Sequence, residues 1–148
     1  MSNVRFVNPD SVDNEVEETK GRAPRTLDKF LAAVRMDSET MDLYVKSLDS
    51  HVTIQELNSR QMTKISQFQQ AGKSEFEIAT EIVGNSLVYP DVNSPDVINE
   101  FRAKLGNEGL TRNEIVARLF KAGEIPLIAE KVMELSGVGE EAIIEAKN

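Results

Sequence analysis

Apolar positions in the C-terminal part of the chain recur at helical spacing and are bounded by residues that start and stop helices. In the segment 110–137, Thr111 and Glu114 form the Thr-x-x-Glu pattern of a capping box, in which each side chain bonds to a backbone N–H of the other. Gly123 interrupts the apolar repeat, and Gly137 follows it where glycine commonly ends a helix. The pattern predicts two consecutive capped helices.

Further helices are predicted upstream of this pair. Asn58 and Ser74 each begin a capping pair ahead of an apolar stripe, and Ser94 followed by proline gives another helix start. The segment 89–94, which begins Tyr-Pro-Asp, is predicted to be a turn. Thr26 is placed to cap a shorter amphipathic helix. The apolar face of that short helix is predicted to comprise Leu27, Phe30, Leu31 and Val34.

The pattern changes from helical to alternating between residues 41 and 55. Apolar and polar positions mostly alternate in 41–46 and again in 52–55, and the link between them contains Ser and Asp. Two such runs joined by a short polar link are typical of a β-hairpin. Because an isolated two-stranded hairpin is marginal in water, we expect it to lie on a helix, a third strand or another chain. Its inner face is predicted to comprise Met41, Leu43, Val45, Val52 and Ile54.

These elements indicate a mainly α (α+β) fold, a multi-helix bundle with a small N-terminal β-hairpin and a disordered N-terminal tail. Residues 1–25 are expected to form a flexible acidic segment, because a composition so rich in polar residues cannot bury enough apolar surface to offset the entropy of ordering. Residues 26–148 are expected to form a single mostly helical domain with the β-hairpin near 41–55. A short terminal helix is predicted within 140–147.

The charge balance argues against a nucleic-acid partner. The chain has 148 residues, with 25 acidic and 17 basic side chains and a net charge of −8. Phosphate binding needs a concentrated basic face, whereas acidic side chains dominate even the helix predicted at 124–136. The absence of cysteine excludes thiol catalysis and disulfide bonds. The sequence has no apolar run of membrane-spanning length and no signal-peptide pattern, so we expect no membrane association and a cytoplasmic location.

The reactive side chains do not form a recognisable catalytic, cofactor or metal motif. His51 is the single histidine and lies at the hairpin turn, so we expect an ordinary exposed side chain. The segment that starts at Asp91 begins like a calcium loop, but Asp96 and Arg102 occupy the sixth and twelfth positions, which require Gly and Glu. Glycines are scattered as helix stops rather than clustered in a phosphate-binding loop. We therefore expect no catalytic residue, cofactor or metal, and a protein that is not an enzyme.

Apolar side chains are densest in the last two predicted helices. The segment 119–135 carries more of them than one stripe on a small bundle needs, although helix stripes more often pack in a core than at an interface. We expect part of this surface to face a partner. The candidate partner-binding residues are Phe120, Ile125, Ile128, Val132 and Leu135.

Several short motifs follow one another in an order similar to that of a known family. The C-terminal motifs are NEIVARLF, KAGEIPLIAEKV and MELSGVGEE. Upstream lie TLDKFL, the strand pair DLYVKSL and HVTIQEL, and the helix opening LNSRQMTKI. Over roughly residues 26–141, the chain resembles the phage tail assembly chaperones of the PBSX-prophage type, called XkdN-like.

This resemblance implies a non-enzymatic protein of the host bacterial cytoplasm. Such chaperones bind the tape measure protein, a long helical chain with exposed apolar faces, keep it soluble and help to recruit tail tube protein during tail assembly. The implied partners are therefore the tape measure protein and the tail tube protein, and no nucleotide is implied. An alternative is a structural adaptor that is retained in the phage particle as a head–tail or tube-end component.

Overall fold

A computed structural model describes residues 26–139 and residue 143 of the chain. Ser38–Gly139 form one compact unit, and residues 26–37 belong to a second unit. The compact unit is thus shorter at its N-terminal end than the domain expected from residue 26 to 148. The predicted flexible segment 1–25 and, apart from residue 143, the helix predicted within 140–147 lie outside the described residues.

The first described helix, α2 (Leu27–Ala33), begins as the sequence predicts. The side-chain oxygen of Thr26 accepts a hydrogen bond from the backbone N–H of Lys29 at 3.2 Å. None of the residues of α2 is buried. The cap therefore fixes where the helix starts, while packing contributes little to its stability.

The predicted β-hairpin is confirmed. Strand β1 (Thr40–Val45) pairs antiparallel with β2 (Ser50–Gln55), and the 3₁₀ turn η1 (Lys46–Leu48) links them. Asp49 closes the link with a φ of 50°, a left-handed conformation that Asp tolerates better than most residues. On the predicted inner face, Met41 is 38% exposed and Leu43 is half-buried. The remaining inner-face residues, Val45, Val52 and Ile54, are buried.

The hairpin is extended by a third strand, β3 (Leu87–Tyr89), which pairs antiparallel with β2 to give the strand order β1-β2-β3. The turn predicted for 89–94 therefore starts one residue too early, because Tyr89 still pairs with Thr53. The register shifts between Thr53 and Ile54, which marks an irregularity in this pairing. One of the supports expected for the hairpin is thus a strand that the sequence pattern does not reveal.

Four helices of the compact unit begin directly after the predicted residues Asn58, Ser74, Ser94 and Thr111, although the side chain of Ser94 makes no capping hydrogen bond. The helices of this unit are α3 (Ser59–Gln70), α4 (Glu75–Ser86), α5 (Pro95–Leu105), α6 (Arg112–Leu119) and α7 (Glu124–Leu135). Asn58, Ser74 and Thr111 each form a complete capping box with the residue three positions later. Gly106 and Gly137 follow helices with φ values of 66° and 86°, which glycine adopts without strain. Together with the sheet, these helices give the expected mainly α fold.

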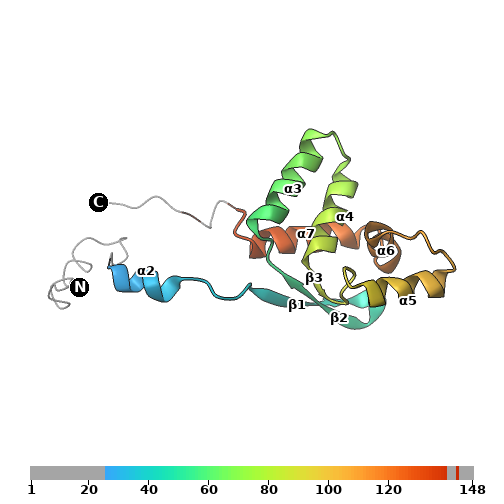
Figure 1. The fold of residues 1–148 in the computed structure, drawn as a ribbon, viewed down its shortest axis with the longest axis horizontal. Helices are drawn as coiled ribbons and strands as arrows, with labels where there is room; N and C mark the ends of the chain where they lie inside the picture. The colour runs from blue at the N-terminus through green and yellow to red at the C-terminus, as the bar shows by residue number, and fades with distance from the viewer. Residues whose placement is uncertain (1–25, 140–142, 144–148) are drawn as a thin grey trace. The chain divides into compact units, whose positions relative to one another are not determined.

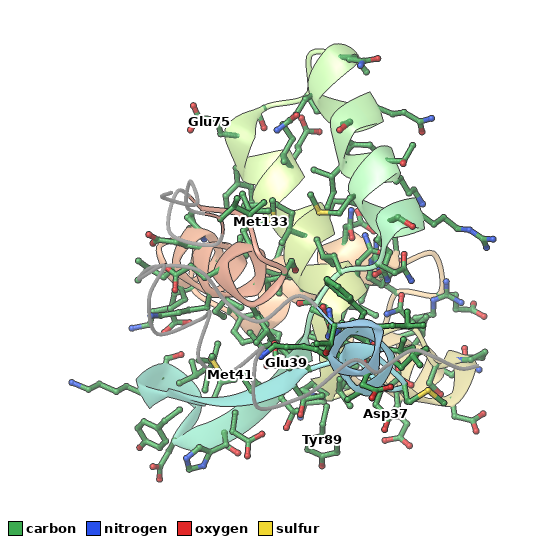
Figure 2. All side chains as sticks on the ribbon, turned by 90° about the vertical axis from the view of Figure 1, so that its left-hand side faces the viewer. Asp37, Glu39, Met41, Glu75, Tyr89 and Met133 are labelled. Atoms are coloured by element: carbon green, nitrogen blue, oxygen red, sulfur yellow. The ribbon has the colours of Figure 1, made fainter. Side chains whose placement is uncertain are left out.

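The core lies between the inner face of the sheet and the helices that cover it. α4 contacts β2, α3, α6 and α7, and α7 also contacts β2, so α4 occupies the centre of the unit (Figure 1). Ile54, Val83 and Val132, from β2, α4 and α7, are each 0% exposed. Figure 2 shows Met41 on the helix side of the sheet and Tyr89 on the opposite side. The sheet therefore has one face in the core and one face that these helices leave open.

Candidate functional site

A buried carboxylate lies at the centre of the compact unit. Glu81 on α4 is only 2% exposed, and among the described residues it is the buried side chain that carries a charge. Burying an unpaired carboxylate costs several kcal/mol, so such a group persists only when it is paired and hydrogen-bonded. Its partners therefore decide what it does.

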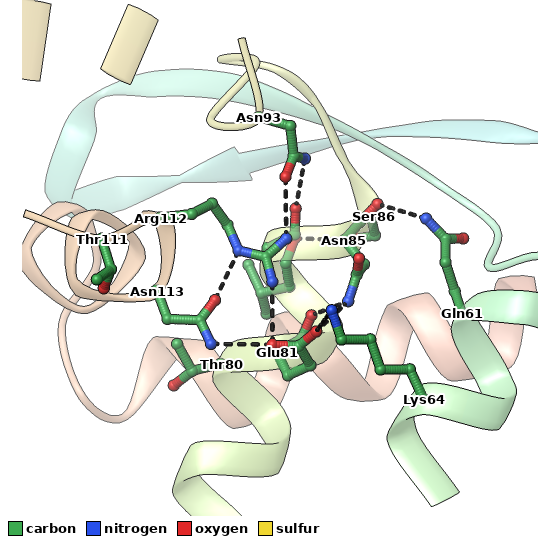
Figure 3. Close-up of polar contacts among 12 residues, drawn as sticks. Gln61, Lys64, Thr80, Glu81, Asn85, Ser86, Asn93, Thr111, Arg112 and Asn113 are labelled. Carbon is green, nitrogen blue, oxygen red and sulfur yellow. Dashed lines mark hydrogen bonds and ion pairs between the residues drawn. The ribbon is translucent and has the colours of Figure 1, made fainter. Parts of the chain in front are cut away.

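Both oxygens of the Glu81 carboxylate accept hydrogen bonds from side chains (Figure 3). Oε1 accepts from Nη2 of Arg112 and from Nδ2 of Asn113, each at 2.9 Å. Oε2 accepts from Nδ2 of Asn85 at 2.8 Å, and Nζ of Lys64 on α3 lies 3.8 Å away. The carboxylate thus connects α4 to the first turn of α6 and to α3.

Arg112 extends this network to the loop that follows β3. Its Nη1 donates to Oδ1 of Asn93 at 3.0 Å, and Nδ2 of Asn93 donates to the carbonyl oxygen of Gly84 at 3.0 Å. The Arg112 side chain crosses α4 directly over Gly84, where a Cβ would lie 2.6 Å from Nε of Arg112. Glycine at position 84 therefore provides the space in which the guanidinium reaches Glu81.

The electrostatics of the network keep Glu81 ionised. Burial raises the pKa of its carboxyl group, but the hydrogen bonds from Asn113 and Asn85 and the charge of Arg112 outweigh burial and lower the pKa below its ordinary value. A general acid or base at neutral pH needs the opposite shift, toward 7. The arrangement is suited to holding α3, α4, α6 and the loop that follows β3 together.

The sequence pattern alone does not reveal this network. The available signal is that Glu81 is the sole charged residue in the run 78–86, which is otherwise apolar or small and neutral. A single carboxylate inside such a helix segment either points to solvent or is buried beside a cationic partner. The partner, Arg112, lies 31 residues away in the sequence, so local spacing cannot identify it.

The predicted partner-binding residues are mostly core residues. Phe120, Ile125, Ile128 and Val132 are buried, with exposed fractions between 0% and 6%, and Leu135 is half-buried against the same core. The prediction that they form a surface is therefore wrong for the first four. The physical reason is that α7 packs along α4 and onto β2, so the apolar side chains that exceed the needs of a single helix stripe are buried in these two contacts.

The exposed apolar side chains lie elsewhere. Leu27, Phe30, Leu31 and Val34 are 60–72% exposed, and Met36 is 85% exposed. The first three belong to α2, and Val34 is its C-cap residue. This stripe, which we call the α2 stripe (Leu27, Phe30, Leu31 and Val34), is the apolar helix face that the sequence predicted, and its side chains are exposed.

A second exposed group lies on the open face of the sheet. Tyr44 and His51 face each other across β1 and β2 with ring centroids 5.3 Å apart, and the Tyr44 hydroxyl donates to Oδ1 of Asp49 at 2.6 Å. That hydrogen bond, together with partial burial, raises the pKa of the Tyr44 phenol. His51 is exposed, as expected, but it lies within β2 rather than in the turn.

No group of three or more His, Cys, Asp or Glu side chains in the described part of the chain is arranged to hold a metal ion. The end of α5 carries a shallow open hollow beside Arg102, Gly106 and Glu108, whose walls show no convergent reactive groups. Within the described ranges, the structure contains no helix that is both long and apolar enough to cross a membrane. The chain matches no family model, no curated protein and no solved structure.

Proposed function

We propose that this protein is a phage tail assembly chaperone that binds the tape measure protein through the α2 stripe. It acts without chemical turnover in the cytoplasm of the host bacterium, keeps its client soluble and helps to recruit tail tube protein. The observation that carries this proposal is the exposed apolar face of α2, on which Leu27, Phe30 and Leu31 are each at least 60% exposed. The resemblance of the order of short motifs to that of the XkdN-like chaperones supports it.

The chemistry of the α2 stripe suits a helical apolar client. Side chains at positions 27, 30, 31 and 34 fall on one helix face, the spacing with which an amphipathic helix packs against a second helix. A tape measure protein is a long helical chain whose apolar faces have nothing to cover them before the tube forms. The two apolar faces would cover each other until tube subunits compete.

The size of the stripe fits reversible binding. Fully burying a Leu or Phe side chain contributes about 1.5–3 kcal/mol, and association costs at least about 4 kcal/mol. Two Leu, one Phe and one Val on a single helix face therefore support weak binding that a competing protein can end. Release would need no nucleotide. The net charge of −8 opposes aggregation of the complexes.

Co-expression with the tape measure protein of the same phage tests the proposal. We expect the client to stay in the soluble fraction with the unchanged chain and to precipitate with the double variant Phe30→Glu/Leu31→Glu. The matched control is Ala32→Glu/Ala33→Glu, which adds the same charge on the other side of α2 and should preserve solubility. A client that precipitates with the unchanged chain, or that stays soluble with every variant, contradicts the proposal.

Mass spectrometry of purified phage particles separates this function from that of a structural adaptor. A chaperone that hands over its client should be missing from finished particles or present far below the level of tail tube protein. A fixed copy number per particle would instead identify a retained head–tail or tube-end component.

A further inference from the structure

Strand β1 forms one edge of the three-stranded sheet. Among the residues that the structure describes, β1 pairs with a strand on one side only, the side of β2. Natural edge strands are usually shielded by charged side chains, above all lysine, by proline, by a bulge or by short length, and β1 carries one charged side chain, Asp42. The opposite edge, β3, has such protection, because it is three residues long and Pro90 follows it. β1 has six residues, TMDLYV, with neither proline nor lysine.

The open face next to this edge carries aromatic rings and carboxylates. Tyr44 is 52% exposed and lies opposite His51 on β2, and Tyr89 is 69% exposed and lies opposite Thr53 on the same strand. Asp42 and Asp49 are the acidic residues on this face. Oδ1 of Asp42 accepts from the Thr53 hydroxyl at 2.7 Å, which uses one acceptor position of a group that offers about four. We call Asp42, Tyr44, Asp49, His51 and Tyr89 the outer patch.

The two faces of the sheet at β1 favour different side chains in an added strand. On the outer patch side, Asp42 and the Tyr44 ring favour a cationic group, which a carboxylate attracts and an aromatic face binds. On the helix side, Met41 is 38% exposed and Leu43 is half-buried, so this side favours an apolar group. Because side chains alternate along a strand, one sequence with alternating basic and apolar residues satisfies both sides.

We propose that β1 and the outer patch bind an extended segment of a partner protein in which basic and apolar residues alternate, and that this segment adds to the sheet as a fourth strand. Arg or Lys side chains of the segment lie over Asp42 and Tyr44, and its apolar side chains lie beside Met41. This inference concerns a surface other than the α2 stripe and does not depend on the function proposed above.

Charge selects this occupant over two others. A second copy of the chain brings another net charge of −8 and a second set of the same carboxylates, so self-pairing at β1 is opposed. A nucleic acid would gain base stacking on the tyrosine rings, but its phosphates would face Asp42 and Asp49. A basic segment gains from both the rings and the carboxylates.

Peptide titration of the full-length chain, followed by amide chemical shifts, tests the inference. The probe is the peptide Ac-SRVRVRS-NH2, and the charge-reversed control is Ac-SEVEVES-NH2. We expect the basic peptide to shift amides in 40–45, with binding that weakens as salt rises. The acidic peptide should give no shifts in this region.

Two N-methylated peptides test whether the segment adds as a strand. Alternate amides of a strand point to the same edge, so methylating either the Arg amides or the Val amides blocks one edge only. We expect one isomer to bind at least about tenfold more weakly and the other to retain the affinity of the parent, because only one edge of the peptide pairs with β1.

Variants of the chain test the outer patch. Asp42→Asn should weaken binding of the basic peptide about threefold, and Asp42→Asn/Tyr44→Leu about tenfold, as expected for the loss of one exposed ion pair and one exposed cation–π contact. The matched control is Glu75→Gln, which removes one exposed carboxylate at the end of α4 that lies far from the sheet (Figure 2).

Each of four results would overturn the inference. The basic peptide gives no shifts in β1 at about 1 mM, the weak limit for a specific complex. Both methylated isomers bind like the parent. The free chain is a dimer in solution with its β1 amides protected from exchange, which assigns the edge to a second copy. An oligouridylate probe shifts the same amides more strongly than the peptide does, which would make the aromatic rings of the outer patch a nucleic-acid binding site.

Discussion

Removing the guanidinium that neutralises Glu81 tests whether this network clamps the helices. Arg112→Ala leaves a carboxylate that is 2% exposed without its charged partner. Losing one partner of a buried pair costs about 3–5 kcal/mol, since the remaining charge is uncompensated. Arg112 is 18% exposed and Lys64 remains 3.8 Å from Oε2. Water entry and Lys64 therefore offset part of this cost, and we expect a loss of about 2–4 kcal/mol in the free energy of unfolding at pH 7.

The pH dependence of this loss identifies its electrostatic origin. In the folded protein the pKa of Glu81 lies below its ordinary value of 4.5. Its contribution to stability is therefore fully present above the pKa of the unfolded chain and disappears as pH falls through the lower pKa of the folded state. Without Arg112 the pKa of Glu81 in the folded state rises. The difference in stability between the unchanged chain and Arg112→Ala should thus narrow as pH falls from 7 toward 4.

Urea denaturation followed by far-UV circular dichroism measures both effects. The matched control is Arg118→Ala, which removes the same side chain from an exposed position of the same helix and should change stability by no more than about 0.5 kcal/mol. If Arg112→Ala costs no more stability than Arg118→Ala, the network does not clamp the helices. If the cost of Arg112→Ala stays constant between pH 7 and pH 4, the loss of stability does not come from the charge of Glu81.

Three further changes test other parts of the structure. Gly84→Ala would ordinarily stabilise a helix by about 1 kcal/mol, but here the new Cβ displaces the Arg112 side chain. We therefore expect denaturation to show that Gly84→Ala alone lowers the free energy of unfolding by about 1–3 kcal/mol. In the Arg112→Ala background, Gly84→Ala should raise the free energy of unfolding. A loss in both backgrounds would contradict the proposed close approach. Ile125→Ala should cost about 2–5 kcal/mol because Ile125 is 0% exposed, whereas Leu127→Ala on the same helix, 63% exposed, should change stability by less than about 0.5 kcal/mol; equal effects would mean that the core is misassigned. Asp49→Asn should lower the pKa of the Tyr44 phenol, because the Asp49 carboxylate accepts a hydrogen bond from the Tyr44 hydroxyl in the folded chain. Ultraviolet titration of Tyr44 in a Tyr89→Phe background should show this shift. An unchanged pKa of Tyr44 would exclude the hydrogen bond.

Local signals in the sequence were sufficient to place most of the elements. Thr111 and Glu114, like the other two capping pairs, act within one helical turn, so their geometry needs no knowledge of the rest of the chain. The alternation that predicted β1 and β2 is equally local, and it also identified their inner face. The N-cap of α2 followed from Thr26 in the same way.

The failures concern interactions between residues that are distant in the sequence. Leu87–Tyr89 have no alternation long enough to predict a strand, and they become β3 because β2 offers an edge beside the end of α4. Phe120 and Val132 were predicted to face a partner, because a helical stripe gives the direction of an apolar face but not what covers it. The α2 stripe has the same kind of pattern, and yet its side chains are exposed.

Most of the elements, their caps and the direction of their apolar faces could therefore be predicted from the sequence, because each of these depends on residues within a few positions of one another. Which faces are covered and which charge is buried depends on contacts between residues that are far apart in the sequence. Glu81 shows the reason. Its position in the sequence of α4 does not distinguish it from an exposed carboxylate, and it is buried because Arg112 and Asn113 of another helix donate hydrogen bonds to it at 2.9 Å. Only the packing of α6 against α4 creates that environment.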